Sequence, residues 1–105
     1  MQRIGFLLKV KPELIEEYQR RHTAVWPEML DAITRSGWQH YSLFMRDDGL
    51  LFGYFETPDS LEAALQTLGR EEVNTHWQEY MQGFFETAGR ADENMVVLQE
   101  VFHLD

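Results

Sequence analysis

The 105-residue chain carries 18 acidic residues against nine Lys and Arg, for a formal net charge of -9, and 44% of it is hydrophobic. Length and composition predict one globular domain, 1–105, and the negative field disfavours nucleic acid as a partner. Because there is no cysteine, no signal-peptide pattern and no run of about 18 apolar residues, we expect a soluble cytoplasmic protein without membrane contact.

The first third of the chain is predicted to hold a strand and an interrupted helix. RIGFLLKV, residues 3–10, alternates apolar side chains in the way typical of a strand. Helical periodicity then covers residues 13–23. Trp26-Pro27 should break this helix, because proline disfavours the α conformation in the residue before it. Pro27 opens a second helical segment, for which Gly37 is the expected stop.

The stretch YQRRHTAVWPEML, residues 18–30, holds the first candidate for chemistry. Tyr18, His22 and Trp26 are spaced by four residues and share one helix face. Surface helices usually bury aliphatic side chains there, so a phenol, an imidazole and an indole are unexpected. His22 is the best acid–base candidate, since an imidazole exchanges protons near neutral pH. The alternative is a half-buried histidine that bonds the backbone.

The middle of the chain predicts a β-hairpin. Residues 38–46 and 50–57 have the composition of strands, and Asp48-Gly49 between them tolerates the positive φ angles of a tight turn. Strict alternation puts Trp38, His40, Ser42 and Phe44 on one face of the first strand and Tyr41, Leu43 and Met45 on the other.

The last part of the chain predicts two helical runs and a final strand. Residues 59–62, DSLE, resemble a capping box that begins a helix ending near Gly69. A second helical run over 71–85 carries Trp77 on its apolar side. Residues 87–94 are expected to form a polar loop, and MVVLQEVFHLD, 95–105, a fourth strand.

The order β-α-β-β-α-β predicts an α+β, ferredoxin-like fold with an antiparallel sheet and both helical regions on one face. The strands are apolar on both faces, as Phe6 with Leu7 and Phe52 with Phe55 illustrate. Helices can cover only one of these faces. We therefore expect the other face to pack against a second copy in an isologous homodimer.

Other sites are disfavoured by spacing. The histidines, at 22, 40, 76 and 103, form no H-x-x-x-H or H-x-H pair, so no metal is expected. No Gly-rich phosphate loop or G-x-S-x-G motif is present. Tyr41 and Trp77 have two interpretations, ordinary core or interface packing and the aromatic wall of a sugar site, because sugar rings stack their C–H faces on aromatic rings.

Four blocks of the chain resemble the L-rhamnose mutarotase family, nearly end to end and in the family's order. They are EEYQRRHTAVWPEML, WQHYSLFMRDDGLLFGYFE, VNTHWQEYM and LQEVFHLD, and the core Y-x-x-x-H-x-x-x-W-P is the most specific. The resemblance implies a homodimeric (dimeric α/β barrel) isomerase. Its reaction would interconvert the α and β anomers of L-rhamnose or a similar 6-deoxy-hexose without cofactor or metal.

Site residues follow from this resemblance. His22 matches the family's proton donor, while Tyr18, Tyr41, Trp77 and the position after it, Gln78, match substrate-contacting residues. This chain departs from the family in two places: some members have Trp-Trp where it has Trp77-Gln78, and its loop ETAGRADEN lacks the Asn-Pro-Asp-Asn-Ser-Pro run of many relatives.

The chemistry expected is acid–base ring opening and reclosure. His22 would handle the proton at the anomeric hydroxyl or the ring oxygen, and Tyr18 or Tyr41 could hold or relay a second proton. Dimeric ferredoxin-like barrels also serve as haem-degrading or cofactor-free monooxygenases and as ligand-binding modules, so the fold alone does not decide. In the haem alternative, His22 or His76 would be the axial ligand.

Overall fold

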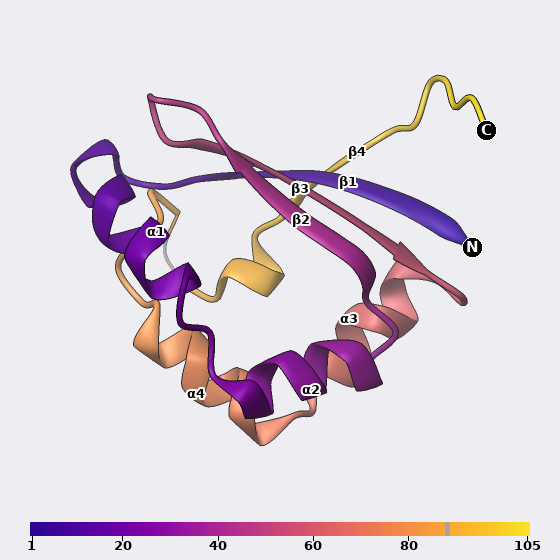
Figure 1. Cartoon of the computed structure of the whole chain (residues 1–105), viewed down its shortest axis with the longest axis horizontal. Helices are drawn as coiled ribbons and strands as arrows, with labels where there is room; N and C mark the ends of the chain where they lie inside the picture. The colour runs from indigo at the N-terminus through magenta and orange to yellow at the C-terminus, as the bar shows by residue number, and fades with distance from the viewer. Residues whose placement is uncertain (88) are drawn as a thin grey trace.

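The computed structural model describes residues 1–87 and 89–105 (Figure 1). Each of the two predicted helical regions contains two α-helices. The elements in chain order are β1 (Gln2–Lys9), the 3-10 helix η1 (Pro12–Leu14), α1 (Ile15–His22), α2 (Pro27–Arg35), β2 (Gln39–Met45), β3 (Leu50–Thr57), α3 (Leu61–Gly69), α4 (Glu72–Tyr80), the 3-10 helix η2 (Ala91–Glu93) and β4 (Val96–Leu98).

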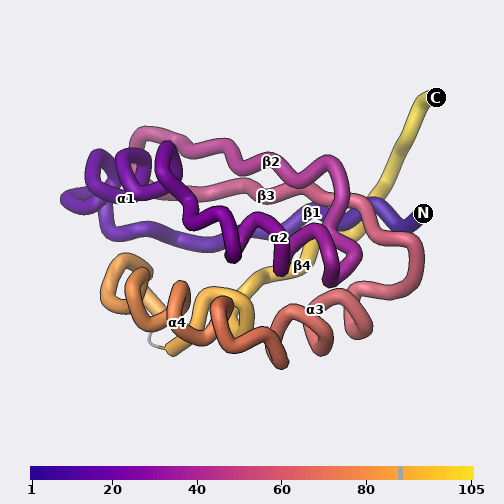
Figure 2. Tube along the Cα trace, turned by 60° about the horizontal axis from the view of Figure 1, so that its bottom comes forward, coloured from indigo at the N-terminus to yellow at the C-terminus, as the bar shows by residue number. Residues whose placement is uncertain are grey.

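The sheet has the strand order β2-β3-β1-β4, and every neighbouring pair is antiparallel. All four α-helices lie on one side of it, and the turned view shows α2 and α4 facing the same surface of the strands (Figures 1 and 2). This arrangement confirms the predicted α+β, ferredoxin-like β-α-β-β-α-β fold. None of the described helices combines the length and the apolar run needed to cross a membrane, and the cytoplasmic location stays a prediction.

The core lies between the sheet and the helices because alternate strand residues point toward the helices. Phe6 of β1 and Phe55 of β3 are almost completely buried, and their rings meet edge to face at 6.3 Å. Phe6 is paired in register with Gly53, whose missing side chain leaves room for the Phe6 ring. Trp38 lies flat against Phe55, with ring centroids 3.9 Å apart. This aromatic layer is the base on which the central cavity rests.

The predicted break at Trp26-Pro27 is confirmed. Trp26 has the extended backbone of an N-cap, φ -58 and ψ 135, and Pro27 is the first residue of α2. The backbone N–H of Met29 donates to the Trp26 carbonyl at 2.9 Å. The break turns the chain between α1 and α2, so the two helices follow different directions across the sheet (Figure 1).

A β-bulge in β2 overturns the strict alternation predicted for that strand. The pairing of Gln39 with Glu56 and of Ser42 with Tyr54 leaves one extra residue on β2. His40 takes up this extra length with a positive φ of 52°, a conformation that is uncommon outside glycine. Trp38 therefore faces the helices together with Tyr41, instead of sharing a face with His40, which is exposed.

Two predicted boundaries are also wrong, and one predicted capping motif does not form. Helix α4 ends at Tyr80 rather than 85, because the backbone of Phe84 and Glu86 pairs with Lys11 and Lys9 instead of continuing the helix, and Gly83 makes the turn with a φ of +89°. The fourth strand covers only Val96–Leu98, and residues 99–105 have no regular structure. Ser60 caps α3 by accepting the Ala63 N–H at 3.1 Å, so the third residue of that helix is an alanine and no reciprocal capping box forms.

Candidate functional site

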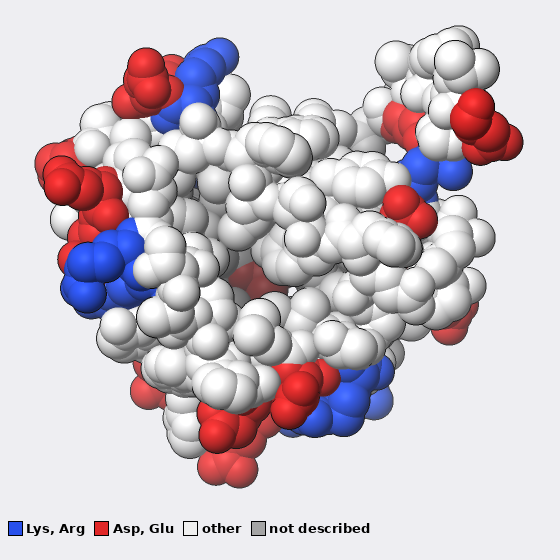
Figure 3. Space-filling model, in the orientation of Figure 1, with Lys and Arg blue, Asp and Glu red and all other residues white. Residues whose placement is uncertain are grey.

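A cavity of about 370 Å³ lies between the inner face of the sheet and the helices. Figure 3 shows its opening as a hollow with uncharged surroundings and acidic atoms at its base. The volume lies in the range of small-molecule sites, about 300–1,000 Å³. His22, Tyr41, Trp77 and Gln78 line this cavity. Tyr18 lines a smaller adjoining space of about 70 Å³ that shares these four residues, so all five predicted site residues lie together.

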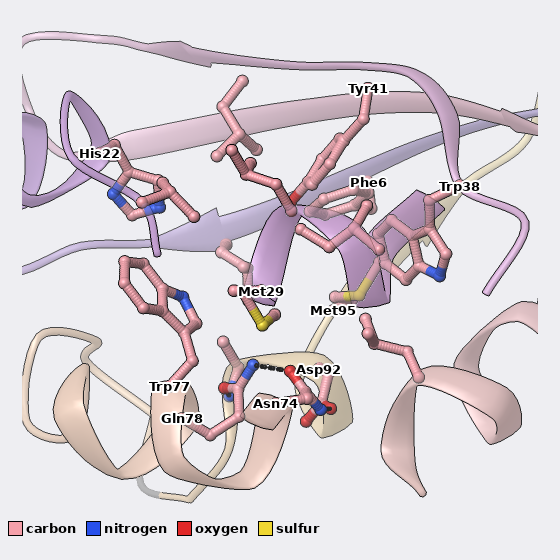
Figure 4. A pocket seen from close by; sticks show the side chains of 17 residues that line it. Phe6, His22, Met29, Trp38, Tyr41, Asn74, Trp77, Gln78, Asp92 and Met95 are labelled. Carbon is pink, nitrogen blue, oxygen red and sulfur yellow. Dashed lines mark hydrogen bonds between the residues drawn. The ribbon is translucent and has the colours of Figure 1, made fainter. Parts of the chain in front are cut away.

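His22 is held at the last residue of α1 with one ring nitrogen occupied. Its Nδ1 lies 2.9 Å from the Tyr18 carbonyl oxygen. Because a carbonyl only accepts hydrogen bonds, Nδ1 carries the hydrogen in the neutral ring, and Nε2 is left as an acceptor. The imidazole stacks on the Tyr18 ring, with the two centroids 4.2 Å apart. It meets Trp77 edge-on at 5.6 Å (Figure 4).

The electrostatic surroundings keep His22 neutral. Burial lowers the pKa of the His22 imidazole from its ordinary 6.5, and the hydrogen bond to the Tyr18 carbonyl opposes that shift only in part. At neutral pH the ring is therefore uncharged and can accept a proton at Nε2. The backbone interpretation and the acid–base interpretation of His22 are thus compatible, because each uses a different nitrogen.

The two tyrosines stay protonated. Burial raises the pKa of the Tyr18 hydroxyl, with a smaller contribution from Tyr41, and burial likewise raises the pKa of Tyr41. Tyr41 keeps 36% of its surface exposed, but its hydroxyl end points into the cavity (Figure 4). A phenol in such surroundings donates hydrogen bonds and is a poor base.

Aromatic and aliphatic side chains form most of the remaining wall. Trp77 of α4 packs edge-on against Trp26, with centroids 5.0 Å apart, which fixes the orientation of its ring. The other apolar groups come from α2, α3, the sheet and the residues just before β2 and β4; they include Phe6, Met29, Ile33, Trp38, Leu68 and Met95.

Sequence reasoning missed a polar part of the wall. Asp92 and Asn74 line the cavity, and Asn74 Nδ2 donates to Asp92 Oδ2 at 3.0 Å (Figure 4). Asn74 is completely buried in α4. Asp92 belongs to the segment that was expected to be only a polar loop. The one available signal was an asparagine one turn before Trp77, on the helix face that points inward.

The other histidines lie apart from this cavity. His40 is exposed at the bulge of β2, and His76 lines a separate groove between α2 and α4. Among residues 1–87 and 89–105, no cluster of three or more His, Asp or Glu side chains could hold a metal ion.

Comparison with known proteins identifies the family. The model of the L-rhamnose mutarotase family matches residues 3–104. The chain is 33% identical to the L-rhamnose mutarotase of Oceanobacillus iheyensis and 35% identical to that of Lactiplantibacillus plantarum, in both cases over 100% of each chain. This chain belongs to the L-rhamnose mutarotase family. The predicted resemblance is therefore confirmed, and with it the class of enzyme, an isomerase.

Solved structures show that the same fold serves other chemistry. The crystal structure of an L-rhamnose mutarotase from Formosa agariphila superposes with a TM-score of 0.81, at 22% identity over 100% of both chains. A crystal structure of an antibiotic biosynthesis monooxygenase superposes with a TM-score of 0.63, at 21% identity over 96% of this chain and 99% of the other. Both likenesses support the fold alone, and the family is decided by sequence.

Proposed function

We propose that this chain interconverts the α and β anomers of L-rhamnose or a closely related 6-deoxy-hexose. The observation that carries the proposal is the state of His22: its Nδ1 is committed to a backbone carbonyl, and its Nε2 is an uncharged acceptor at the wall of a sugar-sized cavity. Family membership supplies the reaction class, and the residues at the cavity supply the chemistry.

His22 acts first as a base and then as an acid. Its Nε2 takes the proton of the anomeric hydroxyl, the C1–O1 bond becomes a carbonyl, and the electron pair of the C1–O5 bond moves to the ring oxygen. The imidazolium then gives the proton to that oxygen, which yields the open-chain aldehyde. After rotation about C1–C2, the same steps in reverse close the ring on the other carbonyl face. One imidazole thus takes and returns the single proton that each ring opening or closure transfers.

The neutral phenols assist without losing their protons. Because the pKa of the Tyr41 hydroxyl is raised, this group donates a hydrogen bond to the ring oxygen as negative charge develops there. Tyr18 holds the imidazole in place by stacking against its ring. The Trp77 ring covers an apolar face of the sugar, and the aliphatic wall receives the C6 methyl group.

The test is exchange NMR between the two anomeric proton signals, with enzyme far below the sugar concentration. L-Rhamnose should exchange faster than without enzyme, and L-mannose, which differs by one hydroxyl at C6, should give a kcat/KM about 10- to 100-fold lower because its hydroxyl enters an apolar wall. Exchange of L-rhamnose at the uncatalysed rate would rule out the proposed function.

We also infer that the outer face of the sheet joins two copies of the chain. Phe44 of β2, 61% exposed, lies beside Phe52 of β3, with ring centroids 6.3 Å apart. Val96 and Leu98 continue this apolar face onto β4. A face of this kind meets its own equivalent in an isologous dimer, which matches the prediction from the two-sided apolar strands.

Sedimentation equilibrium tests the dimer. The parent should have twice its chain mass of 12.5 kDa, and Phe44→Asp should have the mass of one chain because a buried, unpaired carboxylate opposes the contact. Gln66→Asp, which adds the same charge on an exposed position of α3, is the matched control and should remain dimeric. A parent that sediments as a single chain would contradict the inference.

A further inference from the structure

A chain of hydrogen bonds connects α4 to the turn before β4 and ends on Asp92. Gln78 Oε1 accepts the backbone N–H of Ala91 at 3.1 Å, and Gln78 Nε2 donates to Asn74 Oδ1 at 3.2 Å. Asn74 Nδ2 then donates to Asp92 Oδ2 at 3.0 Å. Asn74 is completely buried, so both ends of its amide need hydrogen-bond partners inside the protein. Gln78 and Asp92 provide these partners. The turn is therefore fixed relative to α4.

Arg90 holds the same carboxylate from the other side. Its Nε donates to Asp92 Oδ1 at 3.1 Å and its Nη2 donates to Oδ2 at 2.9 Å, a two-point ion pair. Only 10% of the Asp92 side chain is exposed. The guanidinium offsets the charge of this nearly buried carboxylate, which explains how an anion is tolerated at the wall of an otherwise apolar cavity.

The carboxylate retains one unused acceptor position. A carboxylate has about four lone-pair sites, and three are filled in the described part of the chain: one on Oδ1 and one on Oδ2 by Arg90, and a second on Oδ2 by Asn74. The open position is on Oδ1 of a residue that lines the cavity. It can accept a hydrogen bond from a ligand hydroxyl, and it repels anions.

We propose that Asp92 binds a ring hydroxyl of the sugar and that Gln78 is its positioning residue. This inference rests on the proposed function and names the group that selects a polyhydroxylated ring. Figure 4 shows Asp92 across the cavity from His22 and Tyr41, so the hydroxyl is one remote from the anomeric carbon. Gln78, which the family resemblance predicts to contact substrate, uses both ends of its amide to hold the turn.

The first test compares Asp92→Asn with the parent in exchange NMR and in a direct NMR titration with L-rhamnose. The loss of a charged hydrogen bond should raise KM and Kd about 10- to 100-fold, with kcat within about threefold, as expected for binding that is equal in ground and transition states. The difference should disappear for one of the 2-, 3- and 4-deoxy analogues of L-rhamnose. Glu93→Gln, an exposed neighbour on the same turn, should match the parent.

A second pair of variants tests the positioning role. Gln78→Leu removes both hydrogen bonds of the side-chain amide and should raise KM with little change in kcat. The double variant Gln78→Leu/Asp92→Asn should bind no more weakly than Asp92→Asn alone, since both changes disable the same contact. Additive losses of affinity in the double variant would show that Gln78 does not act through Asp92. Asp92→Ala, with circular dichroism to verify folding, replaces Asp92→Asn if that variant does not fold.

The outcomes separate this inference from the proposed function. Suppose that the parent accelerates exchange but Asp92→Asn has an unchanged KM, or that Asp92→Asn loses the same affinity for every deoxy analogue. Either result would overturn the role of Asp92 and leave the proposed function intact. No acceleration by the parent, with rhamnose binding that still depends on Asp92, would overturn the function and leave the binding residue. A parent that does not bind L-rhamnose at all would overturn both.

Discussion

Replacement of His22 by Gln should lower kcat for anomeric exchange of L-rhamnose by about 10²–10⁴-fold, the usual contribution of a positioned acid–base group. Glutamine keeps a neutral polar side chain beside the Tyr18 carbonyl, but it cannot take the anomeric proton and return it to the ring oxygen. Because the proposed function also places the sugar against Trp77 and the rest of the wall, which this substitution leaves in place, KM should change much less than kcat. Exchange NMR on purified protein measures both.

The pH profile gives an independent readout of the same group. Burial lowers the pKa of His22 below 6.5, and the reactive form is the neutral ring. The kcat/KM of the parent should therefore be level around pH 7 and fall only below pH 6.5, as the imidazole becomes protonated. His22→Gln should lack this acid limb. His76→Gln, at an exposed histidine outside the cavity, is the control and should keep it; a His22→Gln variant with parental kcat would exclude the acid–base role.

Gly53→Ala should strongly destabilise the sheet, with a loss of about 3 kcal/mol in the free energy of unfolding, the upper part of the range for overpacking. An added Cβ would lie within 2.6 Å of three carbons of the Phe6 ring. Phe6 is almost fully buried against Phe55 and Tyr41, so its ring can avoid the added methyl group only by displacing these neighbours or by entering the cavity. Thermal unfolding should show a fall in Tm of roughly 4–8 °C for each kcal/mol lost.

The matched control is Gly69→Ala at the end of α3. No atom lies within 4 Å of a Cβ built there, and alanine favours a helix over glycine by up to about 1 kcal/mol, so its Tm should equal or exceed that of the parent. The double variant Gly53→Ala/Phe6→Leu should lose less stability than the sum of the single changes, because a smaller residue 6 relieves the overlap. Equal Tm values for Gly53→Ala and Gly69→Ala would contradict the proposed overlap between residue 53 and the Phe6 ring.

Much of the fold could be predicted from local signals. The proline after Trp26, the Asp48-Gly49 turn and the alternation in 50–57 each act through backbone conformation of a few residues, and these features appear where they were expected. The family resemblance named the residues around the imidazole, and the structure brings those residues together at one cavity. The ends of α4 and β4 depend on tertiary contacts, which explains why periodicity extended them too far.

The polar part of the site could not be predicted for a different reason. Asp92 stands in a segment with the composition of an ordinary solvated loop, and its place at the cavity depends on Gln78 and Asn74, more than ten residues earlier in the chain. Nor does composition reveal the extra residue of β2, since a histidine with positive φ gives no signal in the alternation pattern. Both features come from contacts that join distant segments.

The bulge lets Trp38 and Tyr41, three positions apart, face the helices together, whereas regular pairing puts residues an odd number of positions apart on opposite faces of a sheet. This shared face therefore depends on the positive φ of His40. A β-branched residue at position 40 would be strained in that conformation and would favour regular pairing. With the strand anchored at the Arg46–Leu50 end, regular pairing would turn Trp38 outward and off the Phe55 ring.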